Sequence, residues 1–171
     1  MGDGDDMSAS AAATGAGSSP PASSAAAGLR VDFYVLEEAA PAARLKVACR
    51  LAEKAYLARQ RALIWHTDRA ELAALDELLW TFADGSFVPH DWLTSNAPAA
   101  APVLLSAGAP PAETFDFVVN LAADPPPFLH LARRVAEIID GDEGRRRAGR
   151  ARFKAYRELG LAPATHTLRP E

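Results

Sequence analysis

The segment "RARFKAYRELGL" (150–161) gathers basic side chains and an aromatic ring at the spacing of one helix face. At 100° per residue, four of its side chains fall on a stripe about 100° wide. These four residues, named here the cationic stripe, are Arg150, Phe153, Lys154 and Arg157. Guanidinium and ammonium groups around an aromatic ring form a receptor for a ligand that has both negative charge and an apolar group.

Another side of the same predicted helix carries mostly small apolar residues, which we expect to pack on the rest of the fold. They are Ala148, Ala151, Ala155 and Leu159. With this packing, Phe153 would lie on the cationic face and outside the core.

The cationic stripe has two other interpretations. A solvated charged helix with one exposed aromatic ring is common on protein surfaces. A nucleic-acid site is less favoured, because the patch is short and local while the whole chain has a formal net charge of −4. Proteins that bind nucleic acid usually spread many basic contacts along it. An acidic peptide that ends in an aromatic residue fits the stripe better.

His66 and Asp68 are the best candidates for a small-molecule site. They follow a predicted strand, and open α/β sheets often bind ligands at strand ends. The more common alternative is a strand-end turn followed by a helix cap. Neither G-x-x-x-x-G-K-[ST] nor G-x-G-x-x-G follows any predicted strand, so no dinucleotide or other cofactor is expected.

The remaining reactive side chains give no catalytic or metal site by sequence. The four histidines, which lack the spacing of metal ligands, are His66, His90, His130 and His166. No G-x-S-x-G or H-E-x-x-H motif supplies a catalytic partner, although a triad assembled only in space stays open. The single cysteine, Cys49, falls in a helical apolar pattern and is interpreted as a small buried residue. A binding protein is therefore favoured over an enzyme.

The scaffold for these residues is predicted from hydrophobic periodicity. Strands are expected at 31–36, 61–67, 102–107 and 115–122. Helices are expected at 41–59, 68–80, from 125–127 onward through Ile139, and at 143–159. This order predicts a three-layer α/β/α sandwich with an open, mostly parallel sheet, Rossmann-like but without a phosphate loop.

The link between the third and fourth predicted strands is only seven residues long. A parallel crossover usually takes a dozen or more. These two strands are therefore expected either to pair antiparallel, which would make the sheet mixed, or not to be neighbours.

Three regions follow from composition. Residues 1–28 form an Ala/Ser/Gly-rich extension that is predicted to be disordered, 29–161 form one α/β domain, and 162–171 form a C-terminal coil. The extension lacks the basic start and apolar run of a secretory signal, and no later segment has eighteen consecutive apolar residues. The expected location is the cytoplasm.

Four segments in order resemble one family. They are "VDFYVL" (31–36), "LDELLW" (75–80), "SFVPH" (86–90) and "RARFKAYRELG" (150–160), and they resemble the chi subunit of bacterial DNA polymerase III over about residues 30–161. The segment 141–144 looks shorter than the loop usual in that family. The resemblance implies a non-enzymatic accessory subunit of the clamp loader, with the psi subunit on one side. On the other side it implies the acidic C-terminal tail of single-stranded DNA-binding protein, which ends in Pro-Phe.

By this resemblance, the tail-binding positions correspond to Arg150, Phe153 and Lys154, while Arg157 is added from its place on the helix. The psi-facing side corresponds to Trp80 and Phe87, and a helicase is a further candidate partner there.

The sequence supports a psi-facing surface independently. Trp80, Phe82, Phe87 and Trp92 crowd into one segment, and aromatic residues are enriched at interfaces. The alternative is a loop that folds its own aromatic rings into the core. Neither direct nucleic-acid binding nor a membrane contact is expected. The competing function is a small nucleotide-binding or nucleotide-sensing protein that acts through His66 and Asp68.

Overall fold

The computed structural model describes residues 28–94, 100–109 and 111–169. The chain forms seven strands, three α-helices and one short 3-10 helix in this part. The elements in order are β1 (Arg30–Leu36), α1 (Pro41–Leu57), β2 (Ala62–His66), α2 (Arg69–Thr81), β3 (His90–Trp92), β4 (Val103–Ala107), β5 (Phe117–Asn120), η2 (Leu129–Leu131), β6 (Arg134–Ile139), α3 (Glu143–Glu158) and β7 (Ala164–Leu168).

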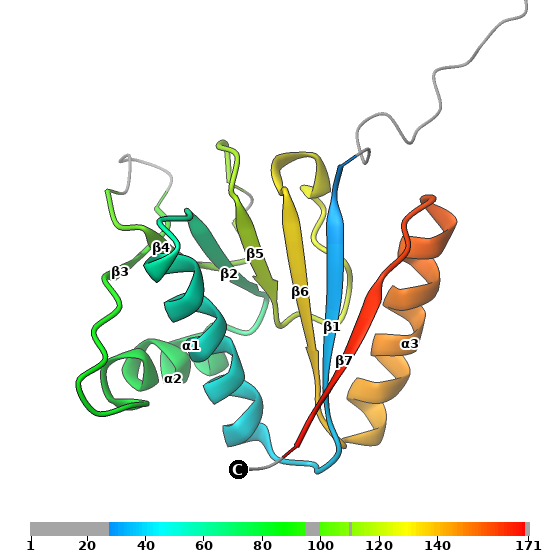
Figure 1. The fold of residues 1–171 in the computed structure, drawn as a ribbon, viewed down its shortest axis with the longest axis horizontal. Coiled ribbons are helices and arrows are strands. Elements are labelled where there is room, and N and C mark those ends of the chain that lie inside the picture. Colours follow the sequence, from blue (N-terminus) through cyan, green and yellow to red (C-terminus); the bar gives the residue numbers. More distant parts are fainter. Residues whose placement is uncertain (1–27, 95–99, 110, 170–171) are drawn as a thin grey trace, which may run out of the picture.

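The strands make one open sheet in the order β3-β4-β2-β5-β6-β1-β7, and every pair is parallel (Figure 1). The predicted α/β sandwich is confirmed. Its central strands are buried on both faces, as the near-continuous apolar runs of β2, β4 and β5 require.

Two hydrophobic cores lie on opposite faces of the sheet. α1 and α2 cover one face, where Cys49, Leu72 and Leu79 are fully buried. α3 and the segment around Phe128 cover the other, where Tyr156 is fully buried. Burial raises the pKa of the Cys49 thiol to about 12, so this cysteine is an inert core residue, as the apolar pattern indicated.

Local signals explain where the helices begin. Pro41 opens α1 at a position where its missing N–H is not needed. Asp68 caps α2, and its Oδ1 accepts hydrogen bonds from the backbone N–H groups of Ala70 (2.9 Å) and Glu71 (3.2 Å). Asp142 caps α3 in the same way, accepting from Arg145 N at 2.8 Å.

The helix predicted from 125–127 through Ile139 is wrong. The chain instead makes the short helix η2 and then strand β6, which pairs with β1 and β5. Val135, Ile138 and Ile139 suit either a helix face or a buried strand by spacing alone. Two features favour a strand over a helix here. The side chains are β-branched, and the segment lies between two other strands.

The short link after β4 is explained by strand order. β2 lies between β4 and β5, so these two strands are not neighbours, and the antiparallel alternative is wrong. The predicted C-terminal coil is also wrong in part, because Ala164–Leu168 form β7 along the edge of β1. This edge strand is largely exposed and lacks an apolar run, which is why composition did not indicate it.

The predicted disordered extension (1–28) lies almost entirely outside the described residues. Within the described part of the chain, no helix has the length and apolar character needed to cross a membrane.

Candidate functional site

α3 carries the cationic stripe on its outer side. Arg150, Phe153, Lys154 and Arg157 line a shallow surface depression of about 440 Å³ together with Glu158. The structure therefore brings the four predicted residues together. Arg150, Lys154 and Arg157 are exposed, whereas Phe153 is half-buried.

Phe153 does not stand free among the charges as expected. Its ring centroid lies 5.3 Å from that of Phe33 on β1, with the planes tilted by 57°. One side of Phe153 thus packs on the core beneath α3, and only the other side can meet a ligand. The expectation that Phe153 lies wholly outside the core is wrong.

The packing side of α3 also differs from the prediction. Its buried residues are Gly149, Arg152 and Tyr156, while Ala151 is exposed and Leu159 is 41% exposed. Gly149 allows a close approach, since a Cβ atom at this position would lie 2.2 Å from Ile139 Cδ1 on β6. The apolar pattern failed here because two buried residues, Arg152 and Tyr156, have polar ends.

Those polar ends meet a buried carboxylate. Glu137 on β6 accepts hydrogen bonds from Arg152 Nε (2.8 Å), Tyr156 Oη (2.6 Å) and Asn120 Nδ2 (2.9 Å). Arg152 also donates through Nη1 to the carbonyl oxygen of Ala123 at 2.9 Å. Burial raises the pKa of Glu137 despite the adjacent Arg152. Burial, with the Glu137 carboxylate beside it, also raises the pKa of Tyr156.

The residues of the motif "RARFKAYR" therefore face in two directions. Arg152 and Tyr156 point inward to Glu137, and this fixes the rotation of α3 about its axis. The same rotation presents the cationic stripe outward. The inward residues were not predicted from the sequence, although an i, i+4 pair of polar side chains on one helix and a lone glutamate within an apolar run were usable signals.

Trp80 and Phe87 form an exposed aromatic pair at the end of α2 and in the loop after it. They are 52% and 61% exposed, and their ring centroids lie 5.6 Å apart. His90 supports the pair from below, with its ring 4.6 Å from that of Trp80. The neighbouring residues Phe82 and Trp92 are instead partly buried against the core.

His90 is itself held in place. Its Nε2 lies 2.8 Å from Asp76 Oδ1, and its Nδ1 lies 2.7 Å from the carbonyl oxygen of Val88. Val88 is fully buried and anchors the loop beneath the aromatic pair. The pair thus has a fixed base. It belongs to α2 and the loop after it, and α2 packs on the face of the sheet opposite to α3 (Figure 1).

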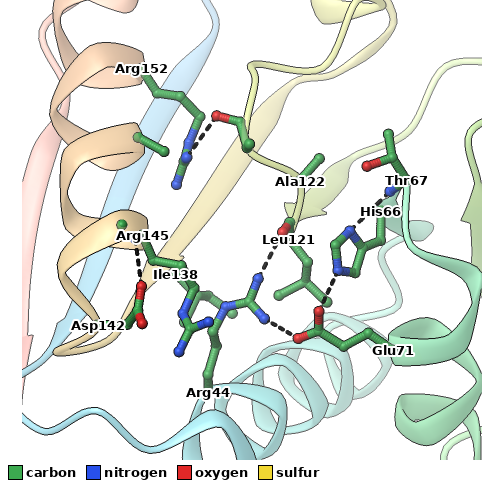
Figure 2. A pocket seen from close by; sticks show the side chains of 13 residues that line it. Arg44, His66, Thr67, Glu71, Leu121, Ala122, Ile138, Asp142, Arg145 and Arg152 are labelled. Atoms are coloured by element: carbon green, nitrogen blue, oxygen red, sulfur yellow. Dashed lines mark hydrogen bonds and ion pairs between the residues drawn. The ribbon is translucent and has the colours of Figure 1, made fainter.

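His66 lines a cavity of about 370 Å³ at the carboxyl ends of β2, β5 and β6, beside the first turn of α3 (Figure 2). Its Nδ1 accepts a hydrogen bond from the backbone N–H of Thr67 at 2.9 Å, so Nε2 is the nitrogen that donates to Glu71 Oε2 at 2.8 Å. Asp68 is not part of the lining and serves as the cap of α2.

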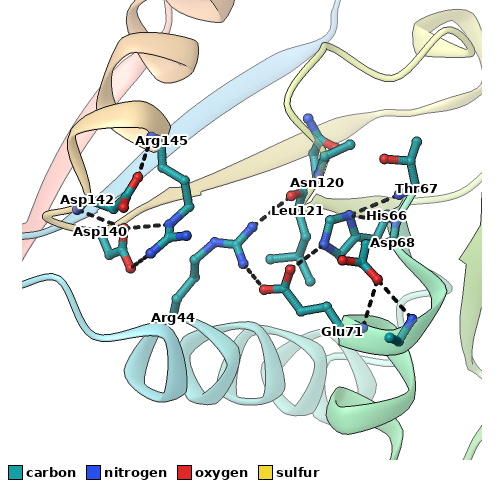
Figure 3. A network of polar contacts seen from close by, with 12 residues as sticks. Arg44, His66, Thr67, Asp68, Glu71, Asn120, Leu121, Asp140, Asp142 and Arg145 are labelled. Carbon is teal, nitrogen blue, oxygen red and sulfur yellow. Dashed lines mark hydrogen bonds and ion pairs between the residues drawn. The ribbon is translucent and has the colours of Figure 1, made fainter.

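Every guanidinium group around this cavity already has a carboxylate partner. The three pairs are Arg44 with Glu71, Arg145 with Asp140, and Arg152 with Glu137 (Figure 3 shows the first two). Burial opposes ionisation of Glu71, but the hydrogen bond from His66 and the charge of Arg44 hold the pKa of Glu71 below its usual value. Burial likewise opposes ionisation of Asp140, and the hydrogen bonds from Arg145 outweigh it, so the pKa of Asp140 is lowered.

A charge-balanced cavity is a poor receptor for phosphate groups, because an incoming anion would compete with a carboxylate for each arginine. The cavity therefore lends no support to the nucleotide hypothesis for His66 and Asp68. In the described part of the chain, no cluster of three or more His, Cys, Asp or Glu side chains could hold a metal ion.

Comparisons with known proteins agree with the resemblance in sequence. The family model "DNA polymerase III chi subunit, HolC" matches residues 29–164. The DNA polymerase III subunit chi of Pseudomonas aeruginosa is 41% identical over 139 residues, which cover 81% of this chain and 96% of that protein. The subunits chi of Haemophilus influenzae and Escherichia coli are each 26% identical, over 80% and 71% of this chain and 95% and 84% of theirs.

Solved structures share the fold at low identity. The crystal structure of T4 UvsW superposes with a TM-score of 0.60 at 11% identity, over 83% of this chain and 42% of that one. The C-terminal domain of the DEAD-box protein Dbp5 gives a TM-score of 0.57 at 11% identity, over 82% of this chain and 91% of that one. At such identity, the likeness concerns the arrangement of strands and helices alone.

Proposed function

Because this chain belongs to the family of DNA polymerase III chi subunits, accessory subunits of the replicative holoenzyme, we propose that it is a non-catalytic adaptor. In this proposal it binds the psi subunit of the clamp loader with one surface. With the other it binds the acidic C-terminal tail of single-stranded DNA-binding protein. The observation that carries the proposal is the cationic stripe, which faces outward on a helix fixed by a buried ion pair.

The charges of the stripe are available to an acidic ligand. Lys154 is 79% exposed, and its Nζ lies 4.0 Å from Glu158, at the limit of an ion pair. Exposed pairs of this kind contribute little, about 0–1 kcal/mol, so a ligand carboxylate could replace Glu158 at small cost. Arg150 and Arg157 are exposed on the same depression.

Phe153 gives the stripe an apolar contact that charge alone lacks. Since its inner side packs on Phe33, the ring is held in one orientation and loses little freedom when a ligand arrives. An aromatic residue at the end of the ligand would rest on the outer side, while the terminal carboxylate reaches Lys154 or Arg150. This arrangement favours the end of a chain over an internal acidic segment.

The psi subunit is proposed to bind at Trp80 and Phe87. Aromatic residues that are half exposed and supported from below are typical anchors of protein interfaces. A helicase that used this same surface would have to compete with psi. The two surfaces lie on different elements, so both partners can be bound together.

Fluorescence polarisation with a labelled acidic peptide ending in Pro-Phe tests the first half of the proposal. Lys154→Glu should weaken binding more than tenfold, because it removes one charge-assisted contact and adds a repulsion. Lys46→Glu, at an exposed position of α1, is the matched control and should bind as the unmodified chain does. Equal effects of the two substitutions would show that the peptide senses only net charge.

A further inference from the structure

Charge is distributed unevenly along this chain. α3 holds seven basic residues against Glu143 and Glu158, although the whole chain has a net charge of −4. The seven are Arg145, Arg146, Arg147, Arg150, Arg152, Lys154 and Arg157. At its other end the chain begins "MGDGDDM", with three aspartates followed by an apolar Met7. A short acidic segment and the most basic helix thus belong to the same molecule.

The basic residues of α3 are not equally free to meet an acidic segment. Arg145 and Arg152 are used within the fold, paired with Asp140 and Glu137. Among the described residues, no carboxylate forms an ion pair with Arg150 or Arg157. Arg146 and Arg147 are exposed and likewise have no carboxylate partner among the described residues, so the uncompensated positive charge of α3 extends from them to the cationic stripe. Of these cations, those of the cationic stripe share a surface depression with the ring of Phe153.

The N-terminal segment starts close enough to reach this stripe. β1 begins and α3 ends at the same end of the sheet (Figure 1), and Phe33 on β1 touches Phe153 directly. Gly28 precedes Phe33 by five residues, or about 17 Å of strand. The 22 residues from Met7 to Gly28 can span up to about 70 Å when extended. The length of chain is therefore ample.

We propose that the acidic segment 3–7 docks on the cationic stripe of its own chain. Its aspartates would meet Arg150, Lys154 and Arg157, and Met7 would lie on the outer side of Phe153. Opposite charge, the length of the intervening chain and the apolar contact support the docking itself. Its consequence, competition with an external acidic tail, rests on the proposed function of the stripe.

Tethering makes a weak contact effective. A segment joined by a short linker acts at a local concentration in the millimolar range. A segment whose affinity is itself about 1 mM would then occupy the stripe roughly half of the time. An external peptide would bind about twofold more weakly than to a chain without the aspartates. The segment would thus weaken the apparent binding of every external acidic partner by about this factor.

The first test compares full-length chains. The triple variant Asp3→Asn/Asp5→Asn/Asp6→Asn should bind the labelled Pro-Phe-ended acidic peptide at least twofold more tightly than the unmodified chain at low salt. The difference should disappear at about 0.5 M salt, where surface charges are screened. A matched triple variant, Glu77→Gln/Asp84→Asn/Asp91→Asn, changes the net charge equally at exposed positions away from α3 and should bind as the unmodified chain does. Equal affinity of all three proteins would overturn the proposal.

The second test does not depend on the external peptide. A labelled peptide of residues 1–12 is titrated with the Asp3→Asn/Asp5→Asn/Asp6→Asn chain, whose own segment cannot compete. Millimolar binding that Lys154→Glu abolishes supports docking, even if the Pro-Phe-ended peptide fails to bind and the proposed function falls. Absence of binding, or binding that Lys154→Glu leaves unchanged, refutes docking while the proposed function can still stand.

The alternative occupant of the cationic stripe is the acidic segment 3–7 of a second molecule. In that case the affinity difference between the unmodified chain and the triple variant would vanish on dilution. The proposal requires that this difference be the same at low and at high protein concentration, because a tethered segment acts at a fixed local concentration.

Discussion

The ring of Phe153 lies 5.3 Å from the ring of Phe33, so the helix that carries the cationic stripe contacts the first strand of the sheet through an aromatic pair. This contact gives one residue a place both in the core and on the surface that we propose binds the acidic tail. The inner side of Phe153 belongs to the core, and its outer side belongs to the surface depression. Substitutions at this position therefore change two measurable quantities.

Phe153→Ala should lower the free energy of unfolding by about 2 kcal/mol, less than the 3–5 kcal/mol of a fully buried phenylalanine. It should also weaken binding of the acidic peptide, while the dependence of binding on salt stays nearly unchanged, because no charge is removed. Urea denaturation and polarisation titrations at several salt concentrations measure both effects. A changed salt dependence would mean that Phe153 orients the charged residues instead of touching the ligand.

Arg152→Leu should destabilise the fold by about 3–5 kcal/mol, because it leaves the buried Glu137 carboxylate without its ion pair. Adding Glu137→Gln to that variant should recover part of the loss, since a neutral amide is less costly to bury than an unpaired carboxylate. Chemical denaturation of the single and double variants measures the coupling. Additive losses would argue that Arg152 and Glu137 act independently.

Trp80→Ala and Phe87→Ala should each weaken psi binding by about 2 kcal/mol, or roughly 30-fold. Both residues are more than half exposed, so the melting temperature should change little. Binding of the acidic peptide serves as the control and should be unaffected, because α3 lies on the other face of the sheet. Parallel loss of peptide binding would indicate a damaged fold and remove support for this interface.

Deletion of residues 1–28 should leave the melting temperature nearly unchanged. The segment "SASAAATGAGSSPPASSAAAG" (8–28) lacks the apolar periodicity that would pack it on the domain, and weak docking of 3–7 adds less than about 1 kcal/mol. Differential scanning calorimetry of the two chains gives the comparison. A fall of several degrees would show that the extension is part of the folded domain.

Much of the fold could be predicted from the sequence because its elements carry strong local signals. Pro41, Asp68 and Asp142 each begin a helix where it was predicted, and apolar runs mark β1, β2, β4 and β5. β6 was mistaken for a helix because the spacing of its apolar residues satisfies both structures. The pairing of this segment with β1 and β5 makes it a strand, and such pairing depends on residues distant in the sequence.

The candidate site was predicted in part for a related reason. The outward residues of α3 are cationic and follow a helical period, so their clustering could be derived from spacing. The inward residues Arg152 and Tyr156 are polar, and only the buried Glu137 explains their position. A periodicity of apolar residues cannot detect a core contact made by hydrogen bonds. For the same reason, the alanine-rich side of α3 was wrongly predicted to be the side that packs on the sheet.

Whether this chain joins two partners at once can be measured by size-exclusion chromatography of the chain mixed with psi and single-stranded DNA-binding protein. We expect one species that contains all three proteins. Lys154→Glu should release only the single-stranded DNA-binding protein, and Trp80→Ala should release only psi. Mutual exclusion of the two partners, or a three-protein species that persists with Lys154→Glu, would show that the chain does not join them through these two surfaces.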